Sequence, residues 1–241
     1  SPLFEGRVSG ERSHRARVWL DTDPDRTGLL PFMWGEDASF ERYAQWALDV
    51  PMFLVKRDAR VVRNTGQTFR AFMRDGFQGA EATLSDWTTH LGTLFPEVRM
   101  KKTIEVRGAD SASRELVPAL PALCKGFLYD AQAREAAEAL GERLGGYDQV
   151  QAVRSAIAEK GLRAQLAGRS VQAWAGDLLD IARAGLQRLN VVDPVSGRDE
   201  SVYLEPLEAL VVAAQTPADA LLAGLDTHQD LVPQVLKLAQ L

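Results

Sequence analysis

The chain has 241 residues, of which 46% are hydrophobic and 25% are charged, and its formal net charge is −5. This composition is typical of a soluble globular protein that can bury a core without disulfide bonds. The negative charge argues against a nucleic-acid partner, because a phosphate backbone is met by clustered Lys and Arg. No apolar run of about eighteen residues occurs, so we expect no membrane span. A single domain over residues 1–241 is the simplest prediction.

Residues that commonly bind metals or form disulfides are few. Cys124 is the one cysteine in the sequence, which excludes an intrachain disulfide and favours a reducing compartment, so a cytoplasmic location is the expectation. His14, His90 and His228 are far apart in sequence, which argues against a zinc site. The sequence contains neither a Walker A loop nor a GxGxxG turn, so any ATP would be bound by another kind of site.

The first 110 residues predict mixed α and β structure from the period of their apolar residues. One segment, 15–20, alternates between polar and apolar side chains, as a strand with one apolar face does. Thr83 and Asp86 have the spacing of a capping box and predict the start of a helix. The expected elements are a strand at 15–20, a helix at 39–48, a hairpin of strands at 50–56 and 60–63, a helix at 83–94 and a long strand at 97–107.

From residue 111 the sequence predicts an all-helical part. The segments with helical spacing are 113–128, 131–144, 147–160, 170–189, 201–214, 216–225 and a last one from about residue 230. Thr216, followed by Pro217 and Asp219, is a strong signal for a helix start. The loop at 194–200 is the segment we expect to be most flexible. The chain is therefore predicted to be an α+β protein whose helical part packs on the mixed part as one domain.

The last strand predicted in the mixed part is the most informative segment for function. Successive side chains of a strand point to opposite faces, so one face would carry Arg99, Lys101, Thr103, Glu105 and Arg107. Three cations and one carboxylate would then extend over about 27 Å, at roughly 3.3 Å per residue. Such cations suit phosphate oxygens, and such a carboxylate suits Mg²⁺. The alternative is an ordinary solvated face of an antiparallel sheet.

A second candidate segment begins at residue 15. As a strand, it would place Arg15, Arg17 and Trp19 on one face. An arginine fork matches a carboxylate bidentately, and a neighbouring indole can shield the pair from water, so this face suits an amino-acid carboxylate. The alternative is a surface strand on which arginine packs against tryptophan without any ligand. Residues 49–53, taken alone, are typical of a buried strand.

Several segments, taken together, resemble one protein family. The longest reads DWTTHLGTLFPEVR at residues 86–99 and continues to EVRGAD at residues 105–110. The others are 15–19, 22–32, 40–43, 47–52, 68–73, 128–130 and 204–208. In this order they resemble the C-terminal half of the glutamate–cysteine ligases of the plant and proteobacterial type. Several long segments in the right order are more specific than any single short motif.

This resemblance implies a glutamine-synthetase-like catalytic fold, in which an antiparallel sheet forms an open site with helices outside. It also implies the first step of glutathione synthesis, in which ATP phosphorylates the γ-carboxylate of glutamate and the amine of cysteine displaces phosphate. Mg²⁺ would bridge the ATP phosphates, while positioning and electrostatic stabilisation replace any nucleophilic side chain. The implied ligands are glutamate, cysteine, ATP and Mg²⁺.

The resemblance assigns four residues to substrate binding. Arg15 matches an arginine that clamps the α-carboxylate of glutamate, with Trp19 beside it, and Arg26 lies on a loop near the substrate. Phe53 takes the place of a family tyrosine that lines the cysteine pocket. The lost hydroxyl removes one hydrogen bond to the acceptor, so a related ligase with another amine acceptor is an alternative.

Four further residues are assigned to the transferred phosphate. Glu105 is the expected metal ligand and acts with Arg107 as a catalytic residue, while Arg99 and Lys101 are expected to bind the nucleotide. The charged face inferred from the strand pattern supports the same assignment without the resemblance.

Length separates this chain from the family that it resembles. Family members run to roughly twice this length, which is unusual for one domain. The part without a counterpart here is the N-terminal half, where the family supplies acidic metal ligands and much of the nucleotide site. That half is therefore an expected partner, on the same or another chain, and we expect these 241 residues alone to be inactive. The alternative is a non-catalytic subunit that keeps the fold.

Overall fold

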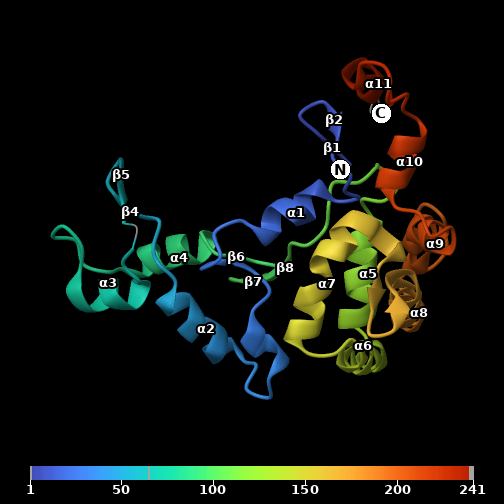
Figure 1. Cartoon of the computed structure of the whole chain (residues 1–241). Coiled ribbons are helices and arrows are strands. Elements are labelled where there is room, and N and C mark those ends of the chain that lie inside the picture. Colours follow the sequence, from blue (N-terminus) through green and yellow to red (C-terminus); the bar gives the residue numbers. More distant parts are fainter. Residues whose placement is uncertain (1, 65, 239–241) are drawn as a thin grey trace. The chain divides into compact units, whose positions relative to one another are not determined.

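The computed structural model describes residues 2–64 and 66–238 and divides into two compact units (Figure 1). The mixed unit is Trp19–Gly108, and the helical unit is Ser1–Val18 together with Ala109–Leu241. The sequence predicted a change from mixed α and β structure to helices at residue 110, which is close to this boundary. It did not predict that the first 18 residues belong to the helical unit. One domain over the whole chain stays a prediction. No helix in the described ranges is long and apolar enough to cross a membrane.

Among the described residues of the mixed unit, the strands are short and pair in twos. Its elements are β3 (Thr27–Gly28), η1 (Pro31–Trp34), α2 (Phe40–Asp49), β4 (Leu54–Arg57), β5 (Arg60–Arg63), α3 (Phe69–Asp75), α4 (Leu84–Gly92), β6 (Phe95–Pro96), β7 (Val98–Met100) and β8 (Ile104–Val106). β3 pairs in parallel with β6, and the pairs β4–β5 and β7–β8 are antiparallel hairpins. Across the described residues the strands form five two-stranded sheets, so the glutamine-synthetase-like sheet stays an expectation.

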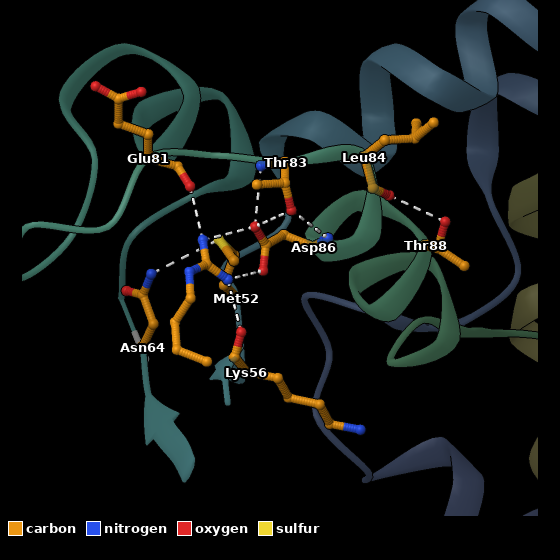
Figure 2. Close-up of polar contacts among 9 residues, drawn as sticks. Met52, Lys56, Asn64, Glu81, Thr83, Leu84, Asp86 and Thr88 are labelled. Carbon is orange, nitrogen blue, oxygen red and sulfur yellow. Dashed lines mark hydrogen bonds and ion pairs between the residues drawn. The ribbon is translucent and has the colours of Figure 1, made fainter. Parts of the chain in front are cut away.

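Local signals placed α2 and α4 correctly, whereas α3 was not predicted. Ser39 accepts a hydrogen bond from the backbone of Arg42 and caps α2. At the start of α4, Thr83 and Asp86 form the predicted capping box (Figure 2). The same Asp86 carboxylate binds the guanidinium of Arg57, on the β4–β5 hairpin, at 2.6 and 2.8 Å. This ion pair joins the hairpin to α4 and makes the cap part of the tertiary structure.

Two strand predictions were wrong. The segment predicted as a strand at 15–20 is instead helix α1 (His14–Leu20), which begins after Ser13, whose hydroxyl accepts from the amide of Ala16 at 3.0 Å. In a helix, residues two positions apart diverge, so Arg17 leaves the face that it would have shared in a strand. The long strand predicted at 97–107 folds back on itself as the hairpin β7–β8.

The core of the mixed unit is built from two neighbouring apolar clusters. Met52, Val55, Phe69 and Phe72 form one cluster, and Ala47, Val50 and Leu94 form the other. Trp87 packs against both clusters, and its ring lies 5.0 Å from that of Phe69. The strand predicted at 50–56 begins only at Leu54, so residues 49–53 do not form the buried strand that was expected. Val50, Met52 and Val55 of this segment are nevertheless buried and join α2, α3 and α4 into one core.

The helical unit is mainly α-helix, but it is not all-helical as predicted. Its elements are β1 (Leu3–Phe4), β2 (Arg7–Val8), α1, which continues past the boundary, α5 (Ala119–Leu128), α6 (Ala131–Arg143), α7 (Tyr147–Lys160), η2 (Gly161–Arg163), β9 (Gln165–Leu166), β10 (Arg169–Ser170), α8 (Val171–Leu189), η3 (Glu200–Leu204), α9 (Glu205–Val212), α10 (Pro217–Ala223) and α11 (Leu231–Leu238). The hairpin β9–β10 turns through Ala167 and Gly168, both at positive φ. Such two-residue turns are short enough to escape a search for helical period.

Two glycines allow α5 and α8 to pack at very close range. A Cβ added at Gly126 would lie 2.3 Å from the carbonyl oxygen of Ala182, and one added at Gly185 would lie 1.9 Å from the carbonyl oxygen of Gly126. Both distances are far below van der Waals contact, so neither position accepts a larger side chain without moving a helix. The apolar residues Leu179, Ala182 and Leu186 of α8 then belong to the core of this unit.

The loop expected to be flexible is held by one carboxylate. Asp193 accepts hydrogen bonds from the hydroxyl of Tyr203 and from the backbone of Ser196, both at 2.6 Å. These bonds lower the pKa of Asp193 to about 2, with the Ser196 bond as the largest cause. Asp193 therefore ties the loop to η3 through its ionised form.

Candidate functional site

The β7–β8 hairpin gathers the predicted phosphate-binding residues around one carboxylate. Arg99 and Glu105 face each other in the antiparallel register, and two guanidinium nitrogens of Arg99 lie 2.6 and 2.8 Å from Glu105 Oε2. Lys101 Nζ lies 3.5 Å from Glu105 Oε1, and Arg107 Nη1 lies 3.6 Å from Oε2. Folding the segment into a hairpin thus replaces the extended charged row by a compact cluster, which we call the cation cluster.

Electrostatics hold Glu105 in its ionised form. The hydrogen bond from Arg99 is the largest cause that lowers the pKa of the Glu105 carboxyl, and the charges of Arg99 and Lys101 lower it further. Three cations against one carboxylate leave the cation cluster with a surplus of two positive charges. An anion with several oxygens, such as a phosphate group, suits that surplus.

Arg99 is fixed by the backbone as well as by Glu105. Its Nη1 donates to the carbonyl oxygens of Gly92 at 3.0 Å and Leu94 at 3.1 Å, at the end of α4. Its side chain is 12% exposed. A guanidinium held on several sides loses little further freedom when it binds a ligand, so Arg99 is pre-organised.

Arg26 and Phe53 form a second group within the mixed unit. The Arg26 guanidinium lies 3.6 Å from the centre of the Phe53 ring, donates from Nε to Asp23 at 2.7 Å and donates from Nη2 to the carbonyl of Pro51 at 2.8 Å. Arg26 is only 3% exposed, and its Nη1 has no hydrogen-bond partner among the described residues. Arg26 therefore stacks on the Phe53 ring and joins the loop before β3 to the segment before β4.

The ring of Phe95 lies between these two groups. It is 6.3 Å from the ring of Phe53, 6.0 Å from that of Trp19 and 5.8 Å from the guanidinium carbon of Arg107. Its amide donates to the carbonyl of Arg26 at 2.8 Å, through the parallel pairing of β6 with β3. Phe95 was missed in the sequence because nothing local separates it from an ordinary core residue.

The opposite face of the hairpin is apolar and borders a cavity of about 240 Å³. Val98, Met100 and Ile104 line it from the hairpin, and Trp34 and Tyr43 line it from η1 and α2. Burial raises the pKa of the Tyr43 phenol. The predicted alternation of charged and apolar side chains is therefore confirmed. The hairpin carries the cation cluster on one face and borders an apolar cavity with the other.

Seven of the eight predicted site residues lie in the mixed unit, and the structure brings them into two linked groups. The cation cluster contains Arg99, Lys101, Glu105 and Arg107, and the aromatic group contains Trp19, Arg26 and Phe53. Arg15 belongs to the helical unit and lies on α1, four residues before Trp19. Arg17, which the strand prediction had placed beside Arg15, instead donates to Glu11 at 2.9 Å and to Ser155.

Other candidate groups have structural roles. His90 is 2% exposed, and its Nε2 lies 2.7 Å from the carbonyl oxygen of Ala47, so it is packed rather than open to a substrate. Cys124 is half-buried on α5, and burial raises the pKa of its thiol. A raised pKa makes a thiol less nucleophilic at neutral pH.

The described residues do not form a metal site by themselves. No group of three or more His, Cys, Asp or Glu side chains that could hold a metal ion occurs among them. Both oxygens of Glu105 already have a cation within 3.6 Å. Mg²⁺ prefers six oxygen ligands, so Glu105 could contribute at most a small part of the coordination.

Comparison with known proteins identifies the family. A family model described as glutamate-cysteine ligase family 2 matches residues 1–235. The chain belongs to this family. The resemblance found in the sequence segments is therefore confirmed, and the family is one of ligase enzymes.

Individual relatives agree with the family match. The chain is 35% identical over 232 residues to glutamate–cysteine ligase A, chloroplastic, of Oryza sativa subsp. indica, with 94% of this chain and 45% of that protein covered. It is 36% identical over 225 residues to the chloroplastic glutamate–cysteine ligase of Arabidopsis thaliana, with 92% and 42% covered. The relative from Medicago truncatula is 36% identical over 231 residues, with 92% and 43% covered.

Two consequences follow from these matches. The chain spans about half the length of the curated relatives it matches, as their covered shares of 42–45% show. The cytoplasmic location predicted from the reducing environment is wrong by this comparison, because these relatives are named chloroplastic. A chloroplast protein can equally lack disulfides within its chain, so a single cysteine did not distinguish the two compartments.

Proposed function

We propose that the protein carrying this chain joins the γ-carboxylate of glutamate to the amine of cysteine at the expense of ATP. The observation that carries the proposal is the cation cluster on the β7–β8 hairpin, which lies within the part matched to the ligase family. The surplus positive charge of the cluster suits the phosphates of ATP and the phosphate that leaves the acyl intermediate.

The proposed reaction has two steps. A γ-carboxylate oxygen of glutamate attacks the γ-phosphorus of ATP and ADP leaves, which gives a γ-glutamyl phosphate. The cysteine nitrogen then attacks the carbonyl carbon, phosphate leaves, and the amine loses a proton. Arg99, Lys101 and Arg107 stabilise charge on the transferred phosphate, and no side chain forms a covalent bond.

We assign binding of the amino-acid substrates to the aromatic group. Phe53 and Trp19 offer apolar rings that both neighbour Phe95, and Arg15 is the proposed partner of the glutamate α-carboxylate. Mg²⁺ remains part of the proposal for the whole protein, with Glu105 as one ligand and the others expected from the length that this chain does not span.

Product analysis tests the proposal. The full-length protein is incubated with ATP, glutamate and cysteine, and ADP, phosphate and γ-glutamylcysteine are measured. Hydroxylamine in place of cysteine should give γ-glutamyl hydroxamate, because it traps the acyl phosphate. ADP release that does not depend on glutamate, or formation of AMP and pyrophosphate, would contradict the mechanism. Arg99→Gln is expected to reduce turnover strongly, and Arg70→Gln, an exposed cation on α3, serves as the matched control.

A second candidate is a ligase that uses another amine acceptor. The specific observation in its favour is that Phe53 stacks on Arg26 and offers no hydroxyl to an acceptor. A screen of amines at fixed glutamate and ATP separates the candidates by kcat/KM, since cysteine should rank first under the first proposal. A non-catalytic role for the 241 residues is tested in the same assay, by whether the isolated chain releases ADP.

A further inference from the structure

We infer that Phe95 is a positioning residue that couples the acceptor side of the proposed site to its phosphate side. The inference rests on the proposed function and adds to it a residue that lies in neither predicted group. Its basis is that Phe95 contacts members of both groups, namely Phe53 and Trp19 of the aromatic group and Arg107 of the cation cluster.

The backbone of Phe95 is fixed on both sides. Its amide donates to the carbonyl of Arg26 at 2.8 Å, and two residues later the amide of Glu97 donates to the carbonyl of Gly28 at 2.9 Å. The next residue, Pro96, is buried, and Leu94 before it is 0% exposed. A ring carried on a backbone held in this way has a defined position, so it can hold its neighbours in place.

The ring of Phe95 acts on Arg107 through its π-face. The guanidinium carbon of Arg107 lies 5.8 Å from the ring centre, within the range of a cation–π contact. Arg107 pairs less closely with Glu105 than Arg99 does. The nearest guanidinium nitrogen of Arg107 lies 3.6 Å from the carboxylate, whereas that of Arg99 lies at 2.6 Å. The ring therefore restricts the one arginine of the cation cluster that Glu105 does not hold closely.

The ring of Phe95 also contacts Phe53. The Phe53 ring is held from one direction by the buried Arg26 guanidinium at 3.6 Å and meets the Phe95 ring at 6.3 Å. Loss of the Phe95 ring would remove a contact both from the wall proposed for the acceptor and from a cation proposed for the phosphate. Since the acceptor nitrogen must approach the acyl phosphate closely, a shift of about 1 Å at either place can cost roughly 100-fold in rate.

Phe95→Leu and Phe95→Trp test the inference in the full-length protein. Phe95→Leu removes the π-face and keeps an apolar side chain, and we expect kcat/KM for the acceptor to fall about 10- to 100-fold. Phe95→Trp keeps an aromatic face and should restore most of the loss. The matched control is Phe77→Leu, a half-buried phenylalanine of the same unit that packs on the Met52 cluster. Unfolding midpoints of all variants are measured alongside, so that lost folding is separated from lost positioning.

A second readout needs no activity. In the 241-residue chain, the Nε–Hε resonance of Arg107 should be shifted by the ring current of Phe95, and Phe95→Leu should remove that shift while Phe77→Leu keeps it. Equal kcat/KM losses in Phe95→Leu and Phe77→Leu, or an Arg107 resonance that is unchanged by Phe95→Leu, would overturn the inference. Absence of ligation by the unaltered full-length protein would instead contradict the proposed function itself, so the two failures are distinguishable.

Discussion

Asp86, at the start of α4, accepts hydrogen bonds from both amino groups of Arg57 at 2.6 and 2.8 Å, although the two residues are 29 positions apart in sequence. Figure 2 shows Asp86 beside Thr83, with the backbone carbonyls of Glu81 and Lys56 directed at the same guanidinium. Asp86 is 4% exposed, so the carboxylate would be costly to bury without these donors. One aspartate thus caps a helix and anchors a hairpin.

Asp86→Asn is therefore expected to lower the free energy of unfolding by about 1–3 kcal/mol, because it weakens both the cap and the ion pair. Urea unfolding at neutral pH measures the change. Asp49→Asn is the control, since Asp49 pairs with Arg70 on the exposed surface and should cost less than about 1 kcal/mol. Equal losses in the two variants would contradict the tertiary role of Asp86.

The same carboxylate predicts an acid dependence. Burial alone would raise the pKa of Asp86, but hydrogen bonds from Arg57 and Thr83 outweigh it and the pKa is lowered. A carboxyl whose pKa is lower in the folded state stabilises the fold above its unfolded pKa of about 3.9, and the contribution is lost as pH falls through the folded value. As the pH falls below about 4, the free energy of unfolding should therefore decrease less steeply in Asp86→Asn than in the unaltered chain.

His90 predicts a second pH dependence, in a higher range. Burial lowers its pKa below the ordinary value, its Nε2 donates to Ala47, and its Nδ1 is buried without a partner among the described residues. In the window between the folded pKa and the unfolded value of about 6.5, only the unfolded state binds the proton, so stability falls as pH decreases. The free energy of unfolding is measured at about pH 8 and about pH 5.5, on either side of this unfolded value. The difference between the two should be smaller in His90→Gln than in the control His228→Gln. His228 is exposed.

Helix packing gives a prediction without titration. Gly126→Ala should destabilise the helical unit by about 1–3 kcal/mol, because the added methyl would meet the Ala182 carbonyl and force α5 away from α8. Gly176→Ala, on the same α8, meets nothing within 4 Å and should stabilise by about 0.5–1 kcal/mol. Thermal unfolding of both variants compares the two directly. A destabilising Gly176→Ala would show that backbone space does not decide the outcome.

Glu105→Gln separates two roles proposed for that carboxylate. If Glu105 mainly orients the surrounding cations, its removal leaves three positive charges, so ATP should bind as tightly or more tightly while kcat falls at least about tenfold. If Glu105 is mainly a metal ligand, ATP binding should weaken and recover at higher Mg²⁺. We expect the first result, because Arg99, Lys101 and Arg107 all lie within 3.6 Å of its oxygens. Titration of nucleotide at two Mg²⁺ concentrations distinguishes the outcomes.

Sequence reasoning succeeded where structure is set by nearby residues. The capping box of Thr83 and Asp86 and the hairpin around Asp58 were predicted from spacing and turn residues. It failed at 15–20, because an alternation of six residues fits a short helix as well, and the capping role of Ser13 decides between them. The turn at Lys101 to Thr103 contains no Gly, Pro, Asn or Asp, so nothing in the sequence indicated that the predicted strand folds back.

The site was predicted in part for a similar reason. Alternation identified which side chains share the charged face, but only the fold shows that they converge on Glu105. The contact of Arg26 with Pro51, and those of Phe95 with its three neighbours, join residues that are distant in sequence or contribute only bulk. No periodic pattern encodes such contacts, so they emerge from tertiary packing.

Successive side chains along β7 and β8 alternate between the charged face and the apolar face of the hairpin, so a shift of one residue exchanges the two faces. An insertion or deletion of one residue in the turn Lys101–Thr103 would turn one strand over, placing valine or isoleucine among the cations and a charged side chain in the apolar cavity. Substitutions at Lys102 and Thr103, which are exposed, leave that offset unchanged. This turn should therefore tolerate changes of residue type far better than changes of length.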